Sequence, residues 1–146
     1  MNKVTVSTWA DAAPKLVAVA AGRAAADLII RKGVWVNVQS RELLPDHDIA
    51  IACGRIAYVG PDASHCAGPG TQVIEAGGRH MLPGLCDGHM HIESGMLTPA
   101  EFARAVIPHG TTTMFTDPHE IANVLGLEGV RLMHDEAMIQ PVNIFT

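Results

Sequence analysis

The stretch MLPGLCDGHMH at residues 81–91 indicates the fold and the chemistry of this chain more strongly than any other. It has the pattern of an apolar strand that opens on Pro-Gly and ends in two histidines one residue apart. Because side chains alternate between the faces of a strand, His89 and His91 are expected to point the same way. Met90 and Ile92 then face the opposite, apolar side. Two neutral imidazoles on one face suit a divalent metal. We predict that His89 and His91 bind a metal, and the alternative is a pair of strand-end and surface histidines.

The residues after this stretch alternate between helix and strand patterns. Thr98 and Glu101 in the sequence Thr-Pro-Ala-Glu predict a helix that begins with a capping box and ends near Pro108. The segments that follow are expected to be a strand, a helix and a strand, at residues 110–117, 127–137 and 141–145. Strands and helices that alternate at this spacing are typical of a parallel α/β array.

The length of this array predicts an incomplete barrel. A (β/α)8 barrel takes about 250 residues, whereas residues 81–146 hold only its first units. The predicted fold class is therefore α/β: the first strands of a metal-dependent (β/α)8 barrel, preceded by a small β-sandwich-like domain. We expect the chain to be the N-terminal part of a longer protein.

The first eighty residues predict a helical segment and a small β-rich domain. Residues 1–26 include an alanine-rich helix that is expected to begin at Pro14, since proline suits a first turn. Residues 27–80 hold short strand patterns separated by turns, which favour a sandwich or small barrel. These strands are expected at residues 27–30, 34–38, 48–51, 56–59 and 73–76, with a boundary at Arg31-Lys32-Gly33.

Further polar residues follow the second predicted barrel strand. Asp117 ends that strand, and His119 and Glu120 are expected in the loop after it. Because the functional groups of a barrel gather at the carboxyl ends of its strands, these three should converge with the two histidines. Their expected roles are to orient the ligands or to touch substrate; hydrogen bonds to strand-end amides or within the loop are the alternatives. Glu93 is a weaker candidate of the same kind, and His109 lies at the opposite end, as a structural residue.

Composition narrows the function classes. The chain has 146 residues and a formal net charge of -5, without a cluster of Lys and Arg that would indicate nucleic-acid binding. No stretch approaches the roughly 20 apolar residues that span a membrane. The three cysteines form no Cys-x-x-Cys pair, which favours a reducing, cytoplasmic setting.

Two longer segments carry a specific resemblance. The PGLCDGHMH stretch together with the later GTTT sequence resembles the amidohydrolase superfamily. Within it, HMHIESGMLTP at residues 89–99 and PHGTTTMFTDPHEIANVLG at residues 108–126 resemble the adenine deaminase family. One departure is Gly95, where that family usually has a second serine after Ser94, and this departure bears on the choice of substrate.

The resemblance implies a specific chemistry. His89 and His91 would bind one metal of a binuclear site holding iron, manganese or zinc, and the other ligands would lie beyond Thr146. Adenine would be hydrolysed to hypoxanthine and ammonia, so the expected partner is a small-molecule purine, and a homo-oligomer is expected. The alternatives are another amidohydrolase that acts on a cyclic amide or N-acetyl substrate, and a non-catalytic fragment. We expect the 146-residue segment alone to be inactive.

Overall fold

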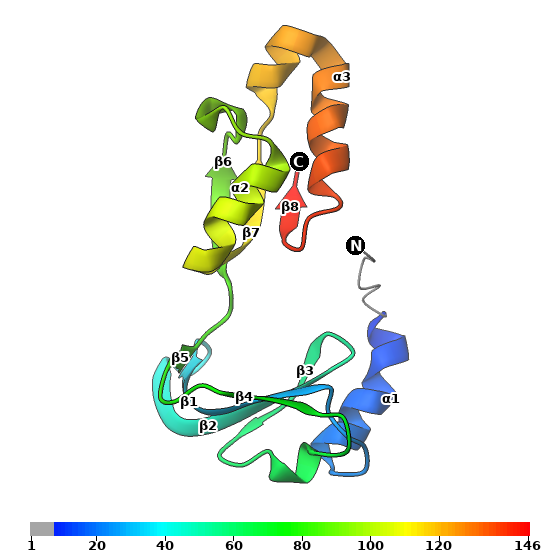
Figure 1. Cartoon of the computed structure of the whole chain (residues 1–146), viewed down its shortest axis with the longest axis vertical. Helices are drawn as coiled ribbons and strands as arrows, with labels where there is room; N and C mark the ends of the chain where they lie inside the picture. The colour runs from blue at the N-terminus through cyan, green and yellow to red at the C-terminus, as the bar shows by residue number, and fades with distance from the viewer. Residues whose placement is uncertain (1–7) are drawn as a thin grey trace. The chain divides into compact units, whose positions relative to one another are not determined.

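The computed structural model describes residues 8–146, which fold as two compact units. The first unit ends at Leu82 and the second runs from Pro83 to Thr146. Figure 1 shows a sheet and a helix in the first unit, and strands with two α-helices in the second. Each unit has its own buried core.

The first unit is built on one five-stranded sheet. Three strands are joined as antiparallel neighbours in the order β3-β2-β1, and two short strands pair with β1 in parallel. The strands are β1 (Leu28–Asn37), β2 (Glu42–Ala52), β3 (Arg55–Gly60), β4 (Gln72–Glu75) and β5 (His80–Met81). The expected strand patterns are therefore present, but those at residues 27–30 and 34–38 belong to the single strand β1, and the short strand β5 is not predicted.

The boundary expected at Arg31-Lys32-Gly33 is wrong, because β1 runs through it. The pairing with β2 shifts register on both sides of Gly33, and Lys32 has a φ of 54°. The carboxylate of Asp48 supports this irregular stretch by accepting the Lys32 amide at 2.9 Å. Its other oxygen accepts the Ala63 amide at 3.0 Å. A bulge supported by a buried carboxylate thus replaces the predicted turn.

The helix α1 (Trp9–Ala20) covers one part of this sheet. Its predicted start at Pro14 is wrong, since Pro14 lies inside the helix. Thr8 is the N-cap, and its hydroxyl oxygen accepts the Asp11 amide at 3.3 Å, which satisfies one of the free amides of the first turn. The buried side chains of the helix pack with sheet residues such as Ile29 and Ala50; they are Ala12, Leu16 and Val19.

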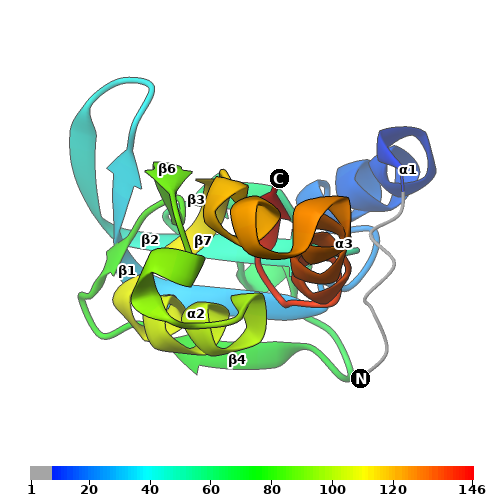
Figure 2. The same ribbon diagram turned by 90° about the horizontal axis from the view of Figure 1, so that it is seen from above.

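The second unit has three parallel strands in the order β6-β7-β8. Two helices connect them, which confirms the predicted alternation, and Figure 2 shows both helices beside the strands. The strands are β6 (Leu85–Met90), β7 (Thr111–Thr116) and β8 (Asn143–Phe145), the helices are α2 (Pro99–Val106) and α3 (His119–Ala137), and short 3-10 turns occur at η2 (Glu93–Gly95) and η3 (Ile107–His109). The strands form an open sheet, and nothing within residues 83–146 closes it into a barrel.

One face of this sheet forms the core of the second unit. Met114 of β7 is fully buried beside Ile92 and Ile144. Phe102 of α2 and Met133 of α3 pack against the same cluster. Met90 and Ile92 therefore lie on the apolar side, as the alternation predicts. His89 and His91 lie on the opposite side.

The predicted capping box at Thr98 is wrong. The Thr98 hydroxyl donates to Glu136 Oε1 at 2.7 Å and makes no cap bond to its own helix. Glu101 instead pairs with Arg104. Glu136 Oε1 also accepts the Ala100 amide, at 3.3 Å. Because this carboxylate accepts two hydrogen bonds at once, it competes successfully for the Thr98 hydroxyl.

The helix predicted at residues 127–137 begins earlier, at His119, and His119 and Glu120 lie in its first turn rather than in a loop. Gly126 interrupts the helix with a φ of 63° and a ψ of -150°. This break hides the first turns from a search for continuous helical periodicity.

Candidate metal centre

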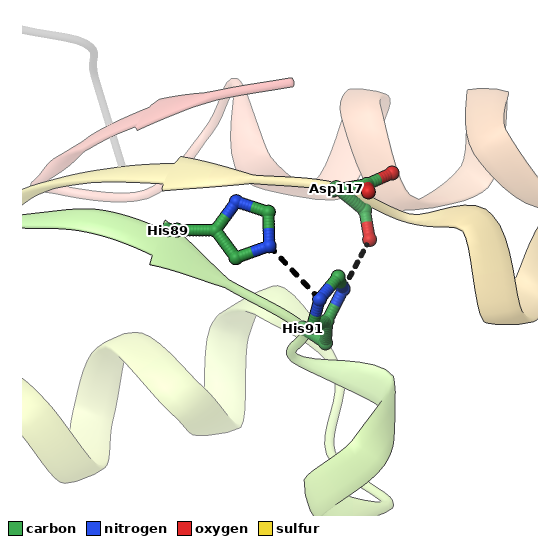
Figure 3. Close-up of side chains that lie close together, drawn as sticks. All are labelled: His89, His91 and Asp117. Carbon is green, nitrogen blue, oxygen red and sulfur yellow. Dashed lines mark hydrogen bonds between the residues drawn. The ribbon is translucent and has the colours of Figure 1, made fainter.

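The two histidines meet at the carboxyl end of β6. Their Nε2 atoms lie 3.0 Å apart, and their rings are nearly perpendicular, at 84° (Figure 3). The pairing of β6 with β7 shifts register between Asp87 and Met90, so a bulge includes His89. The Asp87 carboxylate accepts the His89 backbone amide at 3.1 Å and so holds this irregular turn of the chain. Bulges of this kind redirect side chains beside functional sites.

The orientation of His91 is set by a backbone group. Its Nδ1 lies 2.8 Å from the carbonyl oxygen of Asp117, as Figure 3 shows. A carbonyl only accepts hydrogen bonds, so His91 Nδ1 carries the hydrogen and, in a neutral ring, Nε2 presents its lone pair. This is the tautomer in which a histidine binds a metal through Nε2.

Asp117 follows the last residue of β7, where the sequence predicts it. Its amide donates to the Met90 carbonyl at 3.0 Å, which joins the ends of the two strands. One carboxylate oxygen of Asp117 and one nitrogen of each of His89 and His91 all lie within 4.8 Å of one another. Among residues 8–146 this is the only group of three or more such ligand atoms.

His119 and Glu120 lie beside this group. The His119 ring meets the edge of the His91 ring with centroids 4.6 Å apart, and its Nδ1 lies 3.1 Å from Asp117 Oδ2. Glu120 Oε1 accepts the Ser94 hydroxyl at 2.5 Å. The structure thus brings His119 close to the histidine pair, while Glu120 is engaged with the turn that follows His91.

Glu93 makes a contact that the sequence does not predict. Its Oε1 accepts the backbone amide of Ile121 at 3.4 Å, and its Oε2 is buried without a hydrogen-bond partner among the described residues. The two residues are 28 positions apart, so no local spacing signals the contact. His109 lies in η3, ahead of the first residue of β7, and is absent from the group.

The residues present fit a divalent metal. Two nitrogens that each lie about 2.0–2.1 Å from one ion are about 2.8–3.4 Å apart for angles between right and tetrahedral, and the observed Nε2 separation is 3.0 Å. Imidazole and carboxylate are ligands that zinc, iron and manganese accept. A catalytic site usually takes at least three protein ligands. The described residues supply two histidines and one carboxylate, all partly open to solvent.

Comparison with known families agrees with this geometry. Residues 80–146 match the amidohydrolase family. The matched segment contains the histidine pair and all three strands of the second unit. The predicted resemblance to amidohydrolases is therefore confirmed.

The curated relatives extend the similarity to the whole chain. An adenine deaminase of Ruegeria pomeroyi is 77% identical over 146 residues, which is 100% of this chain and 24% of the relative. An adenine deaminase of Moorella thermoacetica is 54% identical over 136 residues, covering 93% of this chain and 22% of the relative. The predicted resemblance to adenine deaminases is confirmed, and the chain spans about a quarter of the length of these relatives.

Solved structures support the fold. A molinate hydrolase matches 83% of this chain and 29% of its own with a TM-score of 0.61 at 22% identity. A phenylurea hydrolase B matches 82% and 30% with a TM-score of 0.57 at 20% identity. At these identities the likeness concerns the fold alone. No helix within the described residues combines the length and apolar character needed to cross a membrane.

Proposed function

We propose that the protein containing this chain hydrolyses adenine to hypoxanthine and ammonia at a divalent-metal centre that includes His89 and His91. The observation that carries the proposal is the 3.0 Å separation of the two Nε2 atoms, with the Asp117 carboxylate within 4.8 Å. Adenine is proposed as the substrate because the relatives that match the whole chain are adenine deaminases. The partner proposed is accordingly a small-molecule purine.

The reaction requires a nucleophile and a path for protons. Water adds a hydroxyl group to C6 of the ring, the exocyclic C6–N bond breaks, and the other proton of water leaves with the amine as ammonia. The proton of the C6 hydroxyl then moves to N1, which gives hypoxanthine. A bound divalent metal lowers the pKa of water from about 15.7 to about 7 and so supplies the nucleophile near neutral pH. We propose two such ions, of manganese or iron or else zinc, with the further ligands provided outside this chain.

The residues of this chain have distinct roles in the proposal. His89 and His91 bind metal through Nε2, and the Asp117 carbonyl keeps His91 in the required tautomer. Asp117 Oδ2 and His119 Nδ1 lie 3.1 Å apart, close enough to hold and pass a proton at the rim of the site. Glu120 holds the turn after His91 through Ser94.

The setting proposed is the cytoplasm, and a homo-oligomer stays a prediction. The three cysteines are free thiols in the structure, which is compatible with a reducing compartment.

Gly95 lies in η2, in the turn after the metal strand, where a side chain of the expected serine would project from the same segment. Cyclic amides and N-acetyl compounds are the alternative substrates.

The experiment is an ultraviolet assay of adenine loss by the full-length protein, with added Mn²⁺ and with chelator. We expect metal-dependent conversion to hypoxanthine, abolished by His89→Ala and by His91→Ala. His109→Ala is the matched control, because this exposed histidine lies outside the site, and it should retain full activity. Metal binding without adenine conversion would contradict the proposal that adenine is the substrate. Near-normal rates in both histidine variants would contradict the assignment of His89 and His91 as metal ligands.

A further inference from the structure

We propose that Glu93 is a positioning residue of the metal centre: its carboxylate caps the N-terminus of α3 and so holds the Asp117 segment against His91. The inference rests on the proposed metal centre. In this proposal Glu93 acts on the metal centre only by positioning other residues, and it touches neither substrate nor metal.

The first turn of α3 has no cap of its own. Its N-cap residue is Pro118, which has no side-chain acceptor and makes no cap bond. The first hydrogen bond within the helix is donated by the Ala122 amide to the Pro118 carbonyl, at 3.2 Å. The amides of the three preceding residues thus have no partner from the helix itself. Glu93 Oε1 accepts the last of them, that of Ile121.

A carboxylate suits this place for two reasons. It accepts a hydrogen bond that the helix cannot provide, and its negative charge lies at the positive end of the helix dipole. A negative charge at a helix N-terminus is stabilising, and more so when it is partly buried. Glu93 Oε2 is buried, whereas a solvated surface carboxylate would keep both oxygens in water. The side chain is therefore held in the contact.

The contact completes a series of bonds between residues 90–94 and 117–121. The Asp117 amide bonds the Met90 carbonyl at 3.0 Å, and His91 Nδ1 bonds the Asp117 carbonyl at 2.8 Å. Farther along, Ser94 bonds Glu120 at 2.5 Å and Glu93 bonds Ile121 at 3.4 Å. Because the Asp117 carbonyl orients the His91 ring, movement of the α3 terminus would change the direction of His91 Nε2.

Three substitutions separate the possible roles of the side chain. Glu93→Gln keeps an acceptor oxygen at the same reach and removes the charge. Glu93→Asp keeps the charge and shortens the side chain by one CH₂, so it should lose the Ile121 amide. Glu93→Ala removes both. Glu128→Ala is the matched control, because this glutamate of α3 is exposed and pairs only with Arg131 among the contacts described for it.

The experiment measures Mn²⁺ binding by the full-length protein, with free Mn²⁺ counted by electron paramagnetic resonance. Loss of a residue that orients a metal ligand typically weakens metal binding by about 10–100-fold, so we expect a rise in the dissociation constant of at least about 10-fold for Glu93→Ala. Glu93→Asp should approach the alanine variant. Glu93→Gln should stay within about 3-fold of the parent, which a purely charge-based role would not allow. Glu128→Ala should match the parent.

Hydrogen exchange of the peptide spanning residues 118–125 provides the second readout. We expect faster exchange in Glu93→Ala and Glu93→Asp than in Glu93→Gln, with unchanged circular dichroism. If Glu93→Ala does not fold, the comparison of Glu93→Asp with Glu93→Gln decides. Equal Mn²⁺ affinity in parent, Asp and Ala variants would overturn the inference.

The two proposals fail in different ways. A parent that binds Mn²⁺ but leaves adenine unchanged would contradict the proposed function. The Mn²⁺ affinities of the Glu93 variants would then still decide the role of Glu93. A parent that converts adenine, with variants that bind Mn²⁺ equally well, would contradict only the role of Glu93. A parent that binds no Mn²⁺ would overturn both.

Discussion

His91 donates from Nδ1 to the backbone carbonyl of Asp117 across 2.8 Å, and this bond joins the ends of two neighbouring strands. The bond leaves Nε2 of His91 facing Nε2 of His89 at 3.0 Å. A backbone acceptor cannot be removed by a side-chain substitution at Asp117. The tautomer of His91 therefore depends on the position of the chain after β7, and the carboxylate of Asp117 is left for other contacts.

The two nitrogens of His91 can be tested separately. An asparagine amide can place a donor where Nδ1 lies and has nothing in the place of Nε2. We expect His91→Asn to weaken Mn²⁺ binding by more than the roughly 100-fold that loss of an outer-shell partner can cause. Its free energy of unfolding should stay within about 1 kcal/mol of the parent, because the bond to Asp117 is kept. Metal titration and urea unfolding of the full-length protein measure both.

His91→Ala provides the comparison for that variant. It loses the same metal ligand and also the bond to the Asp117 carbonyl, so it should bind Mn²⁺ as weakly and unfold more easily. If His91→Asn kept parental affinity, Nε2 would not be a ligand.

The interruption of α3 is expected to depend on glycine. Gly126 has a φ of 63° and a ψ of -150°, a combination that residues with a Cβ rarely adopt. No atom lies within 4 Å of a Cβ built there, so the cost of a side chain comes from the backbone alone. Gly126→Ala should lower the free energy of unfolding by about 1–3 kcal/mol, measured by urea titration. Asn123→Ala, at an exposed position of the same helix, should have little effect; equal stability of the two variants would contradict the strain.

The histidine pair and Asp117 were predictable because their signals are local. The two-residue spacing at the end of the predicted strand indicates that His89 and His91 lie together, although a bulge at His89 interrupts the regular alternation. The end of the next predicted strand places Asp117 beside them. The start of α3 was not predictable in the same way, since Gly126 breaks its periodicity. In the sequence, a glycine inside a helix has the same appearance as a glycine that ends one.

Long-range acceptors account for the other differences. Thr98 has the sequence of a capping residue, but Glu136, 38 positions later, accepts its hydroxyl. The Ile121 amide is accepted by Glu93, 28 positions earlier. Spacing rules describe the competition between neighbours in the chain, whereas these bonds depend on which residues the fold brings together.

Asp48 is expected to be a main determinant of stability in the first unit. Its side chain is only 2% exposed and accepts two backbone amides, those of Lys32 and Ala63. Asp48→Ala would leave these amides without their acceptor, so we expect a loss of about 2–4 kcal/mol in the free energy of unfolding. Asp48→Asn keeps one acceptor oxygen and should lose less. Urea unfolding is the measurement, and Glu42→Ala, at an exposed position of the same strand, is the control that should change little.

Cys66 provides a prediction about pH. Burial raises the pKa of the Cys66 thiol above its ordinary value, and the negative charge of Asp62 acts in the same direction. The thiol is fully buried and donates to the Val19 carbonyl at 3.3 Å, a bond that requires the protonated form. In the unfolded chain the thiol ionises first, at a pKa of about 8.5. The stability that the protonated thiol contributes is therefore complete below that pH and is lost as pH rises through the higher pKa of the folded state.

The comparison of parent and Cys66→Ala tests this sign. The difference in their free energies of unfolding should be constant at pH 6–8 and should shift against the parent between pH 8 and 10, as followed by urea unfolding at each pH. In the native parent, alkylation of Cys66 by iodoacetamide at pH 8 should be slow, whereas the urea-unfolded protein should react at the rate of an ordinary thiol. Rapid native alkylation, or a stability difference that moves toward the parent above pH 8, would contradict a raised pKa at this buried position.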